Sequence, residues 1–381
     1  MDLLMLAEGH SERLSTTGSG IPNSIVRHLR AQDHRVSTGD VDLRGLDKLF
    51  GAAISYSRSR QRWVVKYHLG AVPFALRSRE AVKCIKSRRN RLDAVIQWGA
   101  TFSSAKSGVP YFLYCDSNIH ISRESSHSWA ASLDDHEVES AMAREQEVYE
   151  SAAAIFALSE NVRRSFIRDL SIPAEKVETV YAGHNLADNS IPAFSHLQTR
   201  KPSANILFVG REFSRKGGDL LVRAFERVRQ VVPNATLTIV GPKDLSISTP
   251  GVRSLGLLNK DDPNDFQTLM QAYEEACIFA FPTRFEPFGI VLVEAMFFGL
   301  PCVAPRVWAV PEIIQDQETG LLFDPESLED LTRSILQLLQ NPALAVRMGC
   351  AGRKRAEANF TWQRVTSKMA KRIQAEVDLR T

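Results

Sequence analysis

The sequence predicts an α/β protein of two domains, each built on a parallel sheet. A chain of 381 residues is long enough for two domains of ordinary size. Short apolar runs alternate with helical segments along both halves, which is typical of parallel sheets. Between the halves, residues 186–205 are polar, contain proline and lack periodicity, as a linker does.

Composition and cysteine usage narrow the class of protein. The hydrophobic fraction is 44% and the charged fraction is 24%, both ordinary for a globular protein. The five cysteines lack C-x-x-C spacing, which argues against a disulfide framework and a zinc site. The N-terminus does not resemble a signal peptide, and no apolar run approaches the length of a membrane span. We therefore expect a cytoplasmic protein.

In the first half, predicted strands alternate with predicted helices. The strands are predicted over residues 3–6, 93–98, 109–114, 153–158 and 177–181. Helices are predicted over residues 23–31 and 140–152, and a third begins after Ser159, a credible N-cap.

A glycine-rich turn separates the first predicted strand from the first predicted helix. The glycines of Gly18-Ser19-Gly20 would let the backbone approach a phosphate closely. The pattern is GxGxxN rather than GxGxxG, so a nicotinamide-binding site has weak support. A flexible surface turn is the alternative interpretation.

Two acidic positions in the first half invite a functional interpretation. Asp116 follows the strand predicted over 109–114, and ligands of open α/β sheets collect at the carboxyl ends of strands. The alternative is that Asp116 only caps the next segment. Asp40 and Asp42 form a D-x-D pattern that lacks a flanking strand run, so we interpret it as surface and expect no required metal.

Residues 55–91 are strongly basic, with eleven Lys/Arg against one acid, Glu80. As a helix that also carries Trp63 and Tyr67, this stretch could lie on an anionic membrane at the inner face or hold an acidic acceptor. A solvated basic face is the other interpretation. No recognised nucleic-acid-binding module accompanies the charge, so we expect no nucleic-acid partner.

The second half repeats the alternation of strand and helix. The strands are predicted over residues 206–209, 235–240, 252–258, 277–281 and 301–304. The helices are predicted after residue 218, from residue 290 onward, and over residues 265–277, 328–339, 342–360 and 362–379.

Residues 281–295 are the most informative stretch, and they predict a strand, a turn and a helix. Gly289 frees the backbone where the helix opens, and a helix N-terminus presents unpaired N–H groups to an anion. Glu286 and Glu294 are eight positions apart, roughly 12 Å at helical rise, which exceeds the ~5–9.5 Å of a glycosidase pair. The spacing suits a ligand with hydroxyls at both ends and phosphate between them, such as a sugar nucleotide. A solvated helix start is the alternative.

A second strand-to-helix loop, residues 210–218, supplies cations. Arg211 and Lys216 lie among glycines, where they could offset the charge of a departing diphosphate. Isolated basic residues in a loop are more often solvated.

These two loops carry a family resemblance. Glu286 and Glu294 with PFGIVLV between them resemble the E-x7-E motif of retaining GT-B glycosyltransferases of the family-4, or group 1, type. The run from Gly210 through Lys216 is similar to the G-R-x4-K-G pattern of that family. The resemblance implies two Rossmann-like domains that face each other across a cleft. The first, the acceptor domain, would comprise residues 1–190 and a terminal helix at 362–381. The second, the donor domain, would comprise residues 200–361.

The resemblance also implies roles for these residues. Glu294 would hold the ribose, Glu286 the donor-sugar hydroxyls, and Arg211 and Lys216 the diphosphate. Asp116 stands where many relatives carry a histidine near the reacting sugar, with His120 four positions later. The remaining donor-binding residues would act through a glycine-rich backbone or a helix N-terminus: Gly18, Ser19, Gly20, Gly210, Phe288, Gly289, Ile290 and Val291.

The predicted reaction moves a sugar from a nucleoside diphosphate donor to a hydroxyl acceptor with retention at the anomeric carbon. The donor is a substrate, such as a UDP- or GDP-sugar, and no cofactor is required. The acceptor would be a sugar, glycan or lipid-linked hydroxyl, as in glycan, polysaccharide or glycoconjugate biosynthesis. Two alternatives remain: a sugar-nucleotide epimerase or hydrolase on the same fold, and a non-catalytic sugar-nucleotide-binding subunit.

Overall fold

The computed structural model describes residues 1–9, 20–88, 91–187, 190–195 and 203–380. The chain forms two compact units, the first of which combines Met1–Tyr181 with Trp362–Thr381. The second unit is Ala182–Thr361. Gly18 and Ser19 of the predicted glycine-rich turn lie outside the described residues.

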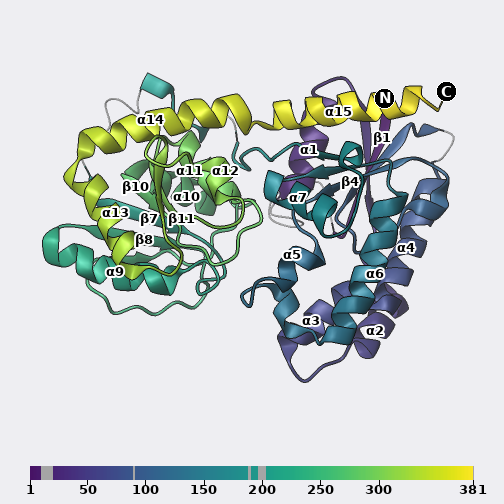
Figure 1. The fold of residues 1–381 in the computed structure, drawn as a ribbon, viewed down its shortest axis with the longest axis horizontal. Helices are drawn as coiled ribbons and strands as arrows, with labels where there is room; N and C mark the ends of the chain where they lie inside the picture. The colour runs from purple at the N-terminus through teal and green to yellow at the C-terminus, as the bar shows by residue number, and fades with distance from the viewer. Residues whose placement is uncertain (10–19, 89–90, 188–189, 196–202, 381) are drawn as a thin grey trace. The chain divides into compact units, whose positions relative to one another are not determined.

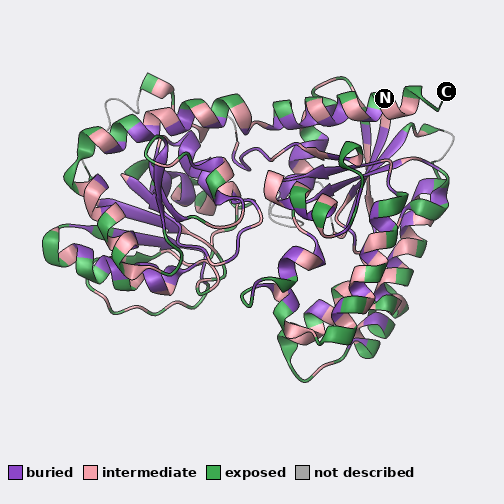
Figure 2. Cartoon of the chain, viewed as in Figure 1, coloured by how far each residue is buried: buried purple, intermediate pink, exposed green. Residues whose placement is uncertain are grey.

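The first unit is built on a six-stranded parallel sheet in the order β2-β1-β3-β4-β5-β6 (Figure 1). Its strands are β1 (Asp2–Ala7), β2 (Arg35–Asp40), β3 (Ala94–Trp98), β4 (Tyr111–Cys115), β5 (Ala154–Ala157) and β6 (Val177–Thr179). In the register, Leu4 lies between Ser37 of β2 and Val95 of β3. The central strands are buried because helices cover both faces of a parallel sheet (Figure 2).

Helices of the first unit connect these strands. They are α1 (Ile21–Arg30), α2 (Gly45–Ile54), α3 (Arg60–Leu69), α4 (Ala71–Lys86), α5 (Ile119–Arg123), α6 (Asp135–Ser151), α7 (Glu160–Arg168) and α15 (Trp362–Asp378), with short 3-10 helices at Ala105–Ser107, Trp129–Ser132 and Ala174–Lys176. Ser159 caps α7, as predicted, by accepting from the Val162 N–H at 3.1 Å. The terminal helix α15 runs beside α1 (Figure 1), and the Gln32 side chain donates to the Thr366 hydroxyl at 2.7 Å.

The structure corrects two local expectations in the first unit. Strand β2 runs directly into Asp40, so the D-x-D pattern does have a flanking strand; it escaped prediction because Val36 is the only fully buried residue of β2. The basic stretch is not one helix, because Gly70 is extended between α3 and α4. A side chain at Gly70 would place its Cβ 2.6 Å from the Lys66 carbonyl oxygen, so the break depends on glycine.

The second unit is built on another six-stranded parallel sheet, in the order β12-β11-β10-β7-β8-β9. Its strands are β7 (Asn205–Val209), β8 (Thr236–Val240), β9 (Val252–Ser254), β10 (Ile278–Ala280), β11 (Cys302–Pro305) and β12 (Gly320–Phe323). Its helices are α9 (Gly218–Val231), α10 (Pro263–Glu275), α11 (Ile290–Phe297), α12 (Val310–Ile313), α13 (Leu328–Gln340) and α14 (Pro342–Asn359). The two parallel sheets confirm the predicted α/β class.

No helix in the described part of the chain is both long enough and apolar enough to cross a membrane.

Candidate functional site: two strand-end loops of the second unit

The two loops singled out by the sequence follow neighbouring strands of the second unit. Strand β7 pairs with β8 on one side and with β10 on the other. The chain leaves β7 through α9 toward β8, so the strand order reverses between β7 and β10. Open α/β sheets bind ligands at such a switch point, outside the carboxyl ends of the strands. The topology therefore brings the loops 210–217 and 281–289 to the usual ligand site of this fold.

Close backbone approach holds these two loops together. Gly217 has φ of 72°, and a Cβ at this position would lie 1.9 Å from the Pro282 carbonyl oxygen. The Arg284 N–H donates to the Arg215 carbonyl oxygen at 3.0 Å. In return, the Arg215 guanidinium donates to the Phe285 carbonyl oxygen at 2.9 Å. Only glycine at position 217 permits this contact, which fixes the register of the loops.

Lys216 and Glu286 form an ion pair across the two loops. The Lys216 ammonium donates to a Glu286 carboxylate oxygen, and only 14% and 10% of the two side chains are exposed. The Phe281 ring centroid lies 5.3 Å from the ammonium nitrogen. Burial lowers the pKa of Lys216, and the adjoining Glu286 carboxylate opposes that shift. The structure thus brings together two of the predicted site residues.

The other cations of these loops differ in their pairing. Arg215 forms a fork with the Glu212 carboxylate, at 2.6 and 2.7 Å. Arg284 pairs with Asp219 at 2.7 Å and with Glu326 at 2.9 Å, and these two carboxylates raise the pKa of Arg284. Arg211 is exposed and forms no ion pair with any described residue. Arg211 is therefore the loop cation that an arriving anion can recruit without breaking a pair.

Helix α11 opens toward these loops with free backbone donors. Its N-cap is Gly289, with φ of 108° and no side-chain cap. The Leu292 N–H donates to the Gly289 carbonyl oxygen at 2.9 Å. Within the described part of the chain, no acceptor partners the N–H groups of Ile290 and Val291. Unpaired donors and the partial positive charge at a helix N-terminus favour an anion there.

Glu294 lies in the second turn of α11 and is fully buried. Its carboxylate accepts from the Lys260 ammonium at 2.6 Å, from the Tyr273 hydroxyl at 3.1 Å and from the Asn185 N–H at 3.3 Å. The sequence predicts that a carboxylate among apolar residues needs partners, but no motif or spacing identifies these three donors. A carboxylate offers about four acceptor positions, and these three donors occupy three of them. A ligand hydroxyl would therefore occupy the fourth position or displace one of the three donors.

The predicted site residues of the first unit are found at its own strand ends and loops. Gly20 is buried and forms the N-cap of α1, with φ of 88°. Asp116 is exposed and follows β4 directly. Asp40 accepts from the N–H groups of Gly9 and Asp42, both at 2.8 Å, so this D-x-D carboxylate is engaged in holding a turn.

One group of possible metal ligands occurs among the described residues of the first unit. Suitable atoms of His120, Glu124 and Asp169 lie within 4.8 Å of one another. However, the Arg168 guanidinium binds the Asp169 carboxylate at 2.5 and 2.9 Å. This ion pair supplies the compensating charge that a metal would otherwise provide.

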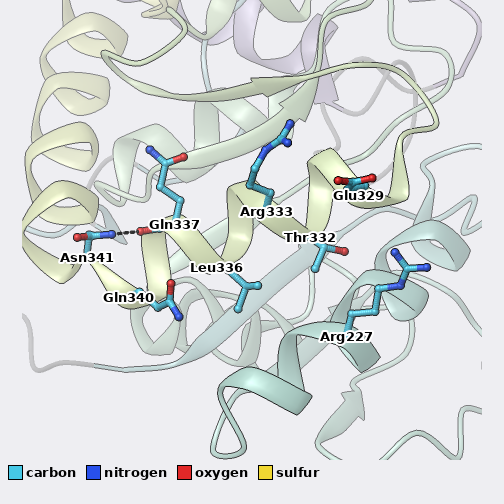
Figure 3. A pocket seen from close by; sticks show the side chains of 8 residues that line it. All are labelled: Arg227, Glu329, Thr332, Arg333, Leu336, Gln337, Gln340 and Asn341. Carbon is cyan, nitrogen blue, oxygen red and sulfur yellow. Dashed lines mark hydrogen bonds between the residues drawn. The ribbon is translucent and has the colours of Figure 1, made fainter.

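An open hollow lies on the second unit (Figure 3). Its lining residues are all supplied by α9, by α13 and by the residue after α13: Arg227, Glu329, Thr332, Arg333, Leu336, Gln337, Gln340 and Asn341. It therefore lies among helices, and none of the predicted site residues lines it.

Solved structures with the same architecture define the fold class. Sucrose-phosphate synthase from Thermosynechococcus elongatus superposes with a TM-score of 0.73 at 19% identity, covering 100% of both chains. WaaG, a glycosyltransferase involved in lipopolysaccharide biosynthesis, gives a TM-score of 0.67 at 16% identity, covering 97% of this chain and 99% of WaaG. The protein has the GT-B fold, as predicted.

Sequence comparisons find similarity to glycosyltransferases, mainly in the second unit. Residues 193–355 match the model of "Glycosyl transferases group 1". A glycogen synthase of Mycobacterium tuberculosis is 27% identical over 265 residues, which are 67% of this chain and 61% of the relative. A GDP-mannose-dependent phosphatidylinositol monomannoside mannosyltransferase of Mycolicibacterium smegmatis is 30% identical over 193 residues, 46% of this chain and 49% of the relative. The matches thus span between half and three fifths of these relatives. The match to the family model lies within the second unit.

Proposed function

We propose that the protein transfers a sugar from a nucleoside diphosphate sugar to a hydroxyl acceptor, with retention at the anomeric carbon. The observation that carries this proposal is the group formed by Lys216, Glu286 and the free N–H groups of α11 at the switch point of the second unit. This group combines a cation, a hydroxyl-accepting carboxylate and an anion-binding helix terminus. A sugar joined to a diphosphate needs these three functions side by side.

In the proposed complex, the diphosphate lies over the N-terminus of α11. The N–H groups of Ile290 and Val291 donate to phosphate oxygens, and Lys216 and Arg211 offset the charge that grows as the sugar–phosphate bond breaks. Side-chain cations and backbone N–H donors of this kind can replace a metal, so we propose that no metal is required. The charge balance favours this arrangement because Arg215 and Arg284 already have carboxylate partners.

The two carboxylates take different parts in the proposed complex. Glu286 accepts from donor-sugar hydroxyls once Lys216 turns to the phosphate. Glu294 accepts from the ribose and shares its carboxylate with Tyr273 and Lys260. The departing phosphate oxygen takes the acceptor proton, and the acceptor oxygen then bonds to the anomeric carbon on the face that the phosphate leaves. This course gives retention without an enzyme nucleophile.

The acceptor side of the proposal rests on the first unit. Asp116 is its candidate contact near the reacting sugar, whereas Gly20 is a candidate contact of the donor diphosphate. The acceptor is a sugar, glycan or lipid-linked hydroxyl of a glycoconjugate pathway. In the basic stretch 55–91, Arg62 and Lys66 pair with Glu137 at 2.9 and 3.1 Å, which leaves less free charge than the sequence suggests. Contact of this stretch with an acceptor or with an anionic membrane remains a prediction.

Nucleotide release distinguishes this proposal from its alternatives. The purified protein is incubated with UDP-, GDP- and ADP-sugars, with and without an extract that contains acceptors. Release of nucleotide only when the extract is present supports transfer. Release without acceptor favours a hydrolase, a changed sugar without release favours an epimerase, and binding without turnover favours a non-catalytic subunit.

A further inference from the structure

Helix α2 of the first unit carries large apolar side chains on its solvent side. Leu46, Leu49, Phe50 and Ile54 are between 53% and 84% exposed. Their spacing of three, one and four positions places them along one face of the helix. We name these four residues the α2 stripe. Scattered single apolar residues are normal on a protein surface, but a continuous stripe marks an interaction site.

Other residues of α2 fix the helix to the rest of the unit. Gly51 is buried, and a Cβ there would lie 3.0 Å from the Leu43 side chain and 3.4 Å from the Tyr67 ring. The Trp63 indole N–H donates to the Ala52 carbonyl oxygen at 2.8 Å, and Arg79 pairs with Asp47 at 2.6 Å. Because these contacts hold α2 in its orientation, the α2 stripe cannot turn inward without breaking them.

Positive charge surrounds the α2 stripe. Residues 44–60 contain four basic residues and one acid, Asp47, whose carboxylate is paired with Arg79. Lys48, Arg58 and Arg60 are exposed, and none of them forms an ion pair with a described residue. Tyr56 is 64% exposed and adds an amphipathic ring beside the stripe. An apolar helix face flanked by free cations is typical of a surface that rests on anionic lipid.

We propose that the α2 stripe docks the protein onto an anionic lipid bilayer. The stripe lies in the boundary between headgroups and acyl chains, while Arg58 and Arg60, which follow the helix, contact the headgroups. A second copy of the chain is the less suitable occupant, because a two-fold interface would bring the same cations together without acids to balance them. The proposal concerns residues 46–60 and does not depend on the donor site of the second unit.

Co-sedimentation with lipid vesicles tests the proposal. The protein of 381 residues is mixed with vesicles of equal parts phosphatidylglycerol and phosphatidylcholine, and with vesicles of phosphatidylcholine alone. We expect binding to the anionic vesicles to be at least tenfold tighter and to weaken with salt, since Arg58 and Arg60 each contribute about fivefold near an anionic surface.

Two variants separate the apolar contribution from general stickiness. The double variant Leu49→Ser with Phe50→Ser should bind the anionic vesicles at least tenfold more weakly, because each large side chain contributes about tenfold when buried. The matched control Val231→Ser removes an apolar side chain that is 53% exposed on α9, and its binding should equal that of the wild type. Circular dichroism checks that each variant is folded.

Three results would overturn the proposal. The first is that the wild type does not sediment with anionic vesicles, and the second is that the double variant sediments as the wild type does. The third is that analytical ultracentrifugation shows a dimer of the wild type, the double variant is monomeric, and neither binds vesicles. That result would assign the α2 stripe to contact with a second copy of the chain.

Discussion

Removing the charge of Lys216 should weaken the binding of nucleoside diphosphates by roughly 30-fold. A unit charge about 4 Å from a phosphate oxygen contributes about 4 kcal/mol at the effective dielectric constant of ~20 that suits partly buried sites. The ammonium already has Glu286 as its partner, so the phosphate replaces a carboxylate rather than water. The net contribution of the ammonium to nucleotide binding is therefore expected to be about half of this value, ~2 kcal/mol. Removing the ammonium should then weaken binding about 30-fold.

The variant Lys216→Met retains most of the side-chain length and removes the ammonium. Isothermal titration calorimetry with UDP, GDP and ADP measures the dissociation constants of the variant and the wild type. Lys216→Arg keeps the charge and should lose much less affinity. Lys354→Met serves as the matched control because Lys354 is exposed on α14 of the same unit. An unchanged dissociation constant in a folded Lys216→Met variant would refute the phosphate assignment.

Three further predictions test the surroundings of the site and the first unit. Glu294→Gln should lower the melting temperature by several degrees and weaken nucleotide binding, because it removes charge-assisted hydrogen bonds of about 1.5–3 kcal/mol each. A dissociation constant equal to that of the wild type would show that Glu294 does not bind the ribose. Gly217→Ala should destabilise the second unit in thermal unfolding because its Cβ would clash with Pro282. The control Gly256→Ala has a similar φ of 69° and no atom closer than 4.0 Å to the added Cβ, so it should lower the melting temperature far less. Equal decreases in melting temperature would contradict this reasoning. Burial raises the pKa of Glu145 to about 7, so its carboxyl stays protonated in the folded chain after it has ionised in the unfolded one, and stability falls between about pH 4.5 and 7. In urea unfolding, the free energy of unfolding of Glu145→Gln should therefore exceed that of the wild type by ~3 kcal/mol at pH 8 and be similar to it at pH 4. The same difference at both pH values would contradict the raised pKa of Glu145.

Local patterns were sufficient to predict most of the fold and the loops of the donor site. The strand, turn and helix at 281–295 were readable because an apolar run, a proline and a glycine mark each boundary within fifteen positions. Strand β2 was missed because an edge strand with only Val36 buried carries almost no hydrophobic pattern. The break at Gly70 was missed because glycine in a helical pattern can be tolerated, and only the packed structure shows the close approach of Lys66.

Contacts between distant parts of the chain could not be predicted from one sequence. Lys260 and Tyr273 precede Glu294 by 34 and 21 positions and come from different segments, so no periodicity relates them. The α2 stripe illustrates the same limit. Its apolar spacing would ordinarily predict a face turned toward the core, whereas the packing of Gly51 turns that face to solvent.

A crystal structure with a bound nucleoside diphosphate tests the central proposal most directly. The nucleotide is whichever of UDP, GDP and ADP binds most tightly in the calorimetric titration. The account predicts phosphate oxygens within hydrogen-bond distance of the N–H groups of Ile290 and Val291, with the Lys216 ammonium turned from Glu286 to the phosphate. Phosphates bound elsewhere, with the ion pair of Lys216 and Glu286 intact, would contradict it.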